Sequence, residues 1–144
     1  MSKILTVRGI GNAGDVDKIL LFGGQQGNFS KAYRILSFTI TPKDPMASNE
    51  ISATINTIEV AHVVAWNWSK NTQIAWAAWG VPISTRFGIY SNVDEEAIVV
   101  EDLYIDFSGP IPSEINYELK LEQVDVSDFQ AALSMVNARA QGSD

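Results

Sequence analysis

The stretch INYELKLE, residues 115–122, alternates apolar and polar residues without interruption. Ile115, Tyr117, Leu119 and Leu121 recur at every second position, with polar or charged residues between them. Successive side chains of a β-strand point to opposite faces of its sheet, so this period predicts a strand with one buried and one solvated face. The fold is therefore expected to contain a sheet that covers a core on one side.

The same period recurs along most of the chain. Residues 32–41 place Leu36, Phe38 and Ile40 on one face of a second strand. Further strand candidates, bounded by turn-forming residues, span residues 3–8, 17–22, 51–60, 73–79, 86–90 and 98–107. About eight strands at this spacing predict an all-β domain, a sandwich or a barrel.

Two of these candidates contain a slip in the apolar face. In residues 51–60 the apolar side changes near Asn56, and in residues 98–107 it changes around Glu101 and Asp102. One extra residue in a strand moves all following side chains to the other face, which is the effect of a β-bulge. We expect strands that bend at both places.

Only the C-terminal segment has a helical pattern. Ser127 and Gln130 have the spacing of a capping box, and Phe129 and Leu133 follow at helical spacing. The predicted helix covers residues 127–139, and a helix this short needs an apolar surface on which to pack. That surface belongs either to the same domain or to a neighbouring subunit, which makes Phe129 a candidate interface residue.

Two glycine-rich segments lie within the first thirty residues. Gly9, Gly11 and Gly14 match the dinucleotide-binding pattern G-x-G-x-x-G. That pattern must open a helix, whereas the residues that follow here read as another strand, so we interpret the glycines as a turn or a flexible arm. Residues 1–28 are predicted to form a glycine-rich N-terminal arm, and residues 29–144 a single β-sandwich domain.

Composition limits the class of protein. The 144 residues suffice for one domain, and they are 46% hydrophobic but only 19% charged, so we expect other chains to cover part of the surface. The absence of Cys excludes disulfides and thiolate metal sites. We see neither a signal peptide nor an apolar segment long enough for a membrane span, which predicts synthesis in a host cytoplasm.

Charge is distributed unevenly along the chain. Residues 1–93 carry eight Lys and Arg against five Asp and Glu, and residues 94–144 carry two against twelve, which gives +3 and −10. This split predicts a surface that meets another copy of the chain or a basic partner. Glu118 and Glu122, on the solvated face of the best-defined strand, are therefore candidate interface residues. Scattered cations and a net charge of −7 disfavour nucleic-acid binding.

No residue set specifies a reaction. His62 is the single histidine, and Glu59 is the only acid close to it in sequence, so a structural role is favoured over a catalytic one. The acidic turn at residues 94–96 lacks the ligand spacing of a calcium loop. The protein is predicted not to be an enzyme, with no catalytic residues, cofactor or metal site.

The tryptophans offer two interpretations. Trp66 and Trp68 are two residues apart, so on a strand they project from the same face. Such a pair suits a core or subunit interface, because Trp supplies a large buried area, and it also suits a platform on which sugar rings stack. We favour the interface interpretation for both residues.

Three stretches resemble the small all-β structural proteins of phages and other viruses: NTQIAWAAWG (71–80), IVVEDLYIDF (98–107) and INYELKLEQVDVSDFQAALSMV (115–136). The resemblance implies a β-sandwich, which in such proteins can be a jelly roll, repeated in a capsid shell or a decoration layer. The resulting hypothesis is a non-enzymatic, self-assembling virion protein whose partners are copies of itself and other virion proteins. The alternative is a β-sandwich module that binds carbohydrate or another ligand.

Overall fold

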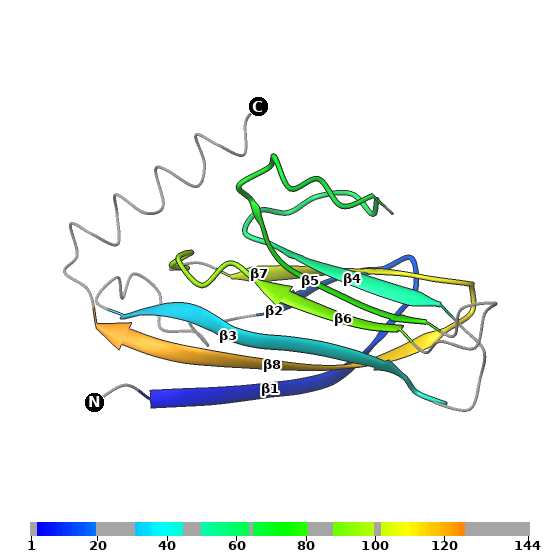
Figure 1. Ribbon diagram of the computed structural model, residues 1–144, viewed down its shortest axis with the longest axis horizontal. Helices are drawn as coiled ribbons and strands as arrows, with labels where there is room; N and C mark the ends of the chain where they lie inside the picture. The colour runs from blue at the N-terminus through cyan, green and yellow to red at the C-terminus, as the bar shows by residue number, and fades with distance from the viewer. Residues whose placement is uncertain are drawn as a thin grey trace.

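The computed structural model describes residues 3–19, 31–44, 50–63, 65–80, 88–99 and 102–125, and all regular elements in these ranges are β-strands (Figure 1). In chain order they are β1 (Lys3–Asn12), β2 (Val16–Ile19), β3 (Lys31–Pro42), β4 (Ile51–Asn56), β5 (Gln73–Gly80), β6 (Gly88–Val93), β7 (Leu103–Ser108) and β8 (Glu114–Asp125).

The strands form two antiparallel sheets. One has three strands in the order β1-β8-β3, and the other has five in the order β2-β7-β4-β5-β6. In Figure 1, β1, β8 and β3 form the lower layer, and β4, β5, β6 and β7 lie above it. The predicted all-β class and two-sheet arrangement are confirmed.

The core lies between the two sheets. On β8 the alternation predicted from the sequence holds, because Ile115, Leu119 and Leu121 are fully buried and Tyr117 packs against the core. Fully buried side chains from the other strands complete it: Ile35 and Phe38 on β3, Ile55 on β4, Ile74 on β5, and Leu103, Ile105 and Phe107 on β7. Each sheet therefore has an inner face toward the core and an outer face.

The bulge predicted near Asn56 does not lie in β4, whose register with β7 is regular through Asn56. The register with β5 shifts at this point because the extra residue, Ile74, belongs to β5. β4 ends at Asn56 and does not continue to residue 60. The strand predicted over residues 98–107 is shorter than expected: β7 begins at Leu103, and before it Val99 makes an isolated bridge. The slip expected around Glu101 falls partly outside the described residues.

A register shift that the sequence pattern did not reveal occurs in β3, between Ile35 and Ser37 opposite β8. Because of this shift the Ile35 side chain points into the core, and only 1% of its surface is exposed, whereas 37% of the Leu36 surface is exposed. The prediction that Leu36 shares the buried face of Phe38 and Ile40 is therefore wrong. An extra residue at the bulge reverses the faces on its N-terminal side.

Most of the described residues of the predicted arm, 3–12 and 16–19, lie instead in the two sheets. β1 pairs with β8 along its whole length, and β2 pairs with β7. Gly9 and Gly11 lie within β1, where an added Cβ would lie 2.6 Å from the Tyr117 hydroxyl and 2.2 Å from the Phe107 ring, respectively. These glycines make room for aromatic rings. Gly14, with φ of +91°, does need glycine for its backbone conformation in the turn before β2.

The helix predicted over residues 127–139, with Phe129, lies outside the described residues, as do residues 20–28 of the predicted arm. Within the described ranges, no helix has the length and apolar character that a membrane crossing requires.

Candidate functional site

The uneven charge distribution is partly accounted for by ion pairs within the chain. Four salt bridges each join a cation from residues 1–93 to an acid from residues 94–144: Arg8–Glu118 at 2.7 Å, Lys18–Asp102 at 3.3 Å, Arg34–Glu122 at 3.5 Å and Lys43–Glu114 at 3.2 Å. The two interface candidates Glu118 and Glu122 therefore have partners on the adjacent strands β1 and β3. Their role at an interface stays a prediction, now without the support of the charge split.

The other interface candidates that can be described, Trp66 and Trp68, lie in the connection between β4 and β5. They are not on a strand, and each contacts a different one. The Trp66 ring lies 5.5 Å from Tyr90 on β6, and the Trp68 ring lies 5.6 Å from Trp76 on β5. Trp68 is 61% exposed, so it does not belong to the core of this chain.

Asp106 anchors the connection between β4 and β5 to the five-stranded sheet. It points to the outer face of β7, and yet only 1% of its surface is exposed. One carboxylate oxygen lies 2.5 Å from Nδ1 of His62, and the other accepts the Val63 backbone N–H at 2.9 Å. A buried carboxylate needs such partners, because an unpaired charge away from water is strongly unfavourable.

Gln73 forms a second anchor nearby. Its Oε1 accepts both the Trp76 side-chain N–H at 3.1 Å and the Asn67 backbone N–H at 2.9 Å. This contact and the Asp106 contact hold the connection, which we call the 57–72 loop, over the outer face of the five-stranded sheet. The structural role of His62 stays a prediction, and its partner Asp106, 44 residues away, was missed by sequence reasoning. The available signal was a carboxylate in the otherwise apolar end of IVVEDLYIDF.

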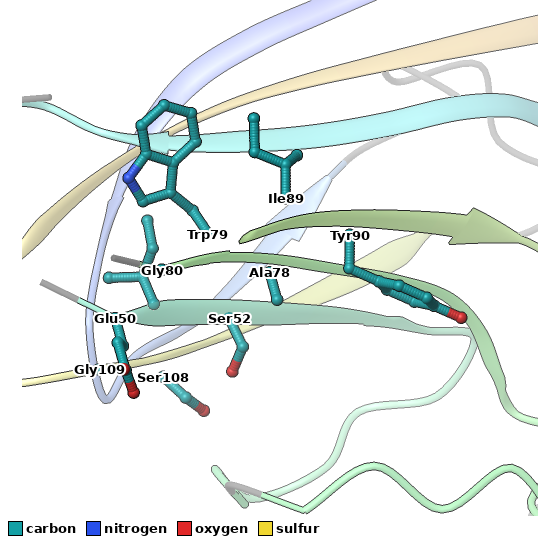
Figure 2. A pocket seen from close by; sticks show the side chains of 10 residues that line it. Glu50, Ser52, Ala78, Trp79, Gly80, Ile89, Tyr90, Ser108 and Gly109 are labelled. Atoms are coloured by element: carbon teal, nitrogen blue, oxygen red, sulfur yellow. The ribbon is translucent and has the colours of Figure 1, made fainter. Parts of the chain in front are cut away.

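A groove of about 530 Å³ lies at the other end of this sheet (Figure 2). Ser52, Ser108 and Tyr90 point to the outer face, whereas Trp79 and Ile89 project from the side toward β3. The remaining lining comes from Glu50, Ile51, Ala78, Gly80 and Gly109. Two hydroxyl groups, a carboxylate and an aromatic ring can together bind a small polar molecule.

A second groove, of about 450 Å³, crosses the outer face of the three-stranded sheet between Arg8, Thr39 and Asn116. Two isoleucines of the edge strand β1 also project from this face, with exposed fractions of 61% for Ile4 and 51% for Ile10. Large apolar residues are normally scarce at sheet edges, where charged residues prevent unwanted pairing. This edge is therefore the second candidate surface.

Two titratable groups lie on the inner side, near the open end of the core. Asp17 pairs opposite Ile105, so its carboxyl points toward the other sheet. Burial raises the pKa of Asp17 above 3.8, and the negative charge of Asp15 raises it further. Burial also raises the pKa of Tyr117 above 10, with a smaller contribution from the Asp17 charge. Tyr117 also lines the groove between Arg8, Thr39 and Asn116.

No three His, Asp or Glu side chains come together as potential metal ligands in the part of the chain that the structure describes. In the acidic turn at residues 94–96, a carboxylate oxygen of Asp94 accepts the backbone N–H of Glu96 at 3.1 Å. This local bond gives the turn a structural role.

The sequence matches no family model and is similar to no curated protein.

Proposed function

We propose that this chain is a non-enzymatic structural protein that assembles with copies of itself, in the capsid or another part of a virion. The observation that carries the proposal is the nesting of its strand pairs: β1 with β8, β2 with β7 and β4 with β5. The bridge between Tyr33 of β3 and Val99, shortly after β6, continues the series. Nested pairs arise when one long hairpin folds over into two sheets, as in the jelly rolls of capsid proteins and lectins.

One feature departs from that pattern. β6 itself pairs with β5 and extends the five-stranded sheet, so the three-stranded sheet has no fourth strand among the described residues. The proposed fold is thus a jelly roll whose smaller sheet is narrow. Without a fourth strand, β3 is an edge strand with only the Tyr33–Val99 bridge on its outer side among the described residues, and an open edge can pair with another chain.

The distribution of exposed apolar residues supports assembly in preference to catalysis. Ile4 and Ile10 lie on the outer face of an edge strand, where burial against a second chain would remove apolar surface from water. His62 and Asp106 could in principle be two members of a catalytic triad. Both carboxylate oxygens of Asp106 are engaged in holding the 57–72 loop, which is a structural use of the pair.

The virion setting rests on the resemblance of residues 71–80, 98–107 and 115–136 to phage structural proteins. The expected partners are copies of this chain and other virion proteins, with no nucleic acid or cofactor. The helix predicted over residues 127–139 would offer Phe129 as a further contact between subunits.

The proposal is tested by the size of the particles that the purified chain forms. We expect multi-angle light scattering and negative-stain imaging to show rings or closed particles of many copies at micromolar concentration. Assembly should improve from low to moderate salt, because screening reduces repulsion between subunits that each carry −7. A monomer or a simple dimer under all conditions would overturn the proposal.

The groove beside Tyr90 favours the alternative function, carbohydrate binding. Tyr90 is 39% exposed and its ring is supported by Trp66, so it can stack on a sugar. The hydroxyls of Ser52 and Ser108 can donate or accept hydrogen bonds there, and the Glu50 carboxylate can accept them. A glycan array and calorimetry with the parent and Tyr90→Ala test this alternative. It requires a sugar signal that Tyr90→Ala weakens at least tenfold, with Trp68→Ala, outside the groove, as the matched control.

A further inference from the structure

The free edge of β1 presents a specific set of backbone groups. The N–H of Ala13 donates to the Ser113 carbonyl at 2.9 Å, in continuation of the β1–β8 register. On the other side of β8, the carbonyl of Glu114 accepts the Lys43 N–H at 3.0 Å, so Glu114 faces β3 and Ser113 faces β1. The odd-numbered residues of β1 therefore bond to β8.

Successive backbone groups of a strand point to alternate sides. The even-numbered residues Ile4, Thr6, Arg8 and Ile10 must then direct their N–H and C=O groups away from β8. No other strand among the described residues pairs with this side of β1, which is ten residues long. The edge is thus a row of unpaired donors and acceptors of the kind to which another strand adds.

We propose that the occupant of this edge is β1 of a second copy, paired antiparallel with Val7 on the twofold axis. This inference rests on the proposed self-assembly and names one of its contacts. In this register Ile4 lies opposite Ile10 of the partner subunit, and Thr6 lies opposite Arg8 of the partner subunit. The two three-stranded sheets become one continuous sheet across an isologous interface.

The hydrogen-bonding pattern requires even-numbered residues to lie opposite even-numbered residues, and the positions of the two isoleucines select Val7 among the registers that meet this condition. Centring the pair on Val7 places each of the four outward-facing residues opposite another of the four, so all their N–H and C=O groups are satisfied. Centring it on Thr6 places Ile4 opposite Arg8, and centring it on Arg8 places Ile4 opposite Asn12. Both shifts separate the two isoleucines.

The side chains fit the same register. Ile4 and Ile10 are the most exposed apolar residues of the three-stranded sheet, and directly opposite positions bring their side chains into contact. Arg8 does not oppose this approach, because Glu118 of its own chain neutralises it at 2.7 Å. Thr6, opposite it, is uncharged.

The absence of Cys in the natural chain permits a direct test of the register. Opposite residues at a non-hydrogen-bonded position have Cα atoms about 4.5 Å apart, within the range of a disulfide. We expect Val7→Cys to form a disulfide-linked dimer under mild oxidation, at least ten times faster than Thr6→Cys or Arg8→Cys. Faster cross-linking at either of the latter two positions would overturn the register.

A second set of variants tests the contact without cross-linking. Thr6→Pro removes an outward N–H that β8 does not use, so the chain should keep its circular dichroism while the β1 contact is lost. Ile4→Lys should weaken the same contact at least tenfold. Ile89→Lys is the matched control, because Ile89 is 60% exposed on β6, an edge strand of the other sheet.

The outcomes separate the contact from the wider function. If particles form but Val7→Cys does not cross-link and Thr6→Pro assembles normally, this contact is wrong and self-assembly stands. If the parent forms only a dimer that cross-links through Val7→Cys, the contact stands and the virion proposal fails. Equal loss of association in Ile4→Lys and Ile89→Lys would overturn the specific role of β1.

Discussion

Nε of Arg8 on β1 lies 2.7 Å from Oε2 of Glu118, the residue directly opposite on β8. Arg34 on β3 makes the corresponding pair with Glu122 on the other side of β8. β8 therefore carries its acids between two strands that supply cations. The division of the sequence into a basic and an acidic part reflects, for these strands, which segments pair within one sheet.

Reversing one of these charges should destabilise the fold slightly. Glu118→Lys places a second cation opposite Arg8, and like charges on directly opposite residues repel each other. Because the Arg8 side chain is 74% exposed, we expect the free energy of unfolding in urea to fall by only about 0.5 kcal/mol. The exchange of both residues, Arg8→Glu with Glu118→Arg, should restore the free energy of unfolding to that of the parent. An exchange variant no more stable than Glu118→Lys would contradict the pairing.

Replacing Gly11 with Ala should be much more costly. The added Cβ would lie 2.2 Å from the ring of Phe107, which is fully buried and has little room to move. We expect a loss of about 2 to 3 kcal/mol in urea unfolding, as for other overpacked cores. Phe107→Leu in the same chain should recover part of this loss. Gly80→Ala is the control, since its Cβ meets only the flexible Glu50 side chain at 3.3 Å and should change stability little.

The sequence was sufficient to predict the fold class because the alternating pattern directly reports burial on one face. Ile115, Leu119 and Leu121 were assigned correctly on that basis. The pattern failed at Leu36, where one extra residue reverses the faces and two consecutive apolar residues, Ile35 and Leu36, hide the change. It failed also for β1, because Gly9 and Gly11 suggest flexibility until the rings that fill their places are known.

The candidate surfaces could not be predicted from residue types alone. Asp106 and His62 are 44 residues apart in sequence, and only the pairing of β7 with β4 brings the carboxylate beneath the 57–72 loop. The edge of β1 likewise follows from strand order, which no local pattern encodes. The size of Trp66 and Trp68 suggests a core or an interface, whereas the structure places both in the loop between β4 and β5.

Trp68→Ala should reduce the stability of the isolated chain only slightly. A fully buried Trp loses several kcal/mol on truncation, but Trp68 is 61% exposed and contacts Trp76 mainly at one side. We expect a change in the free energy of unfolding of about 1 kcal/mol or less. Larger losses that appear only at concentrations where the chain assembles would instead place Trp68 at a subunit interface.

Removing the His62 side chain should release the 57–72 loop. His62→Ala leaves one oxygen of the buried Asp106 without its partner, which we expect to cost about 1 to 3 kcal/mol. Asp106→Asn keeps the size of the side chain and can still accept the Val63 N–H, so it should loosen the loop less. Hydrogen exchange at Val63 measures the effect directly. Unchanged exchange in His62→Ala would mean that Asp106 does not hold the loop through His62.

Asp17 should make the stability of the fold depend on pH. Its pKa is raised from 3.8 in the folded chain, first by burial and then by the charge of Asp15. The folded state thus keeps its proton over a pH range in which the unfolded chain has released it. The stabilisation by protonation is complete below the ordinary pKa and is lost as the pH rises through the folded pKa. Asp17→Asn, which cannot ionise, should therefore be more stable than the parent at pH 7.

The comparison is made by urea unfolding of the parent, Asp17→Asn and Asp15→Asn between about pH 3 and pH 7. The advantage of Asp17→Asn should disappear toward the acid end, where Asp17 of the parent is neutral in both states. Asp15→Asn removes only the smaller cause of the raised Asp17 pKa. It should therefore also raise the free energy of unfolding at pH 7, but by less than Asp17→Asn does. Absorbance titration gives an independent check, because loss of the Asp17 charge should lower the pKa of Tyr117 toward 10. A constant difference between parent and Asp17→Asn across this range would show that Asp17 ionises alike in both states.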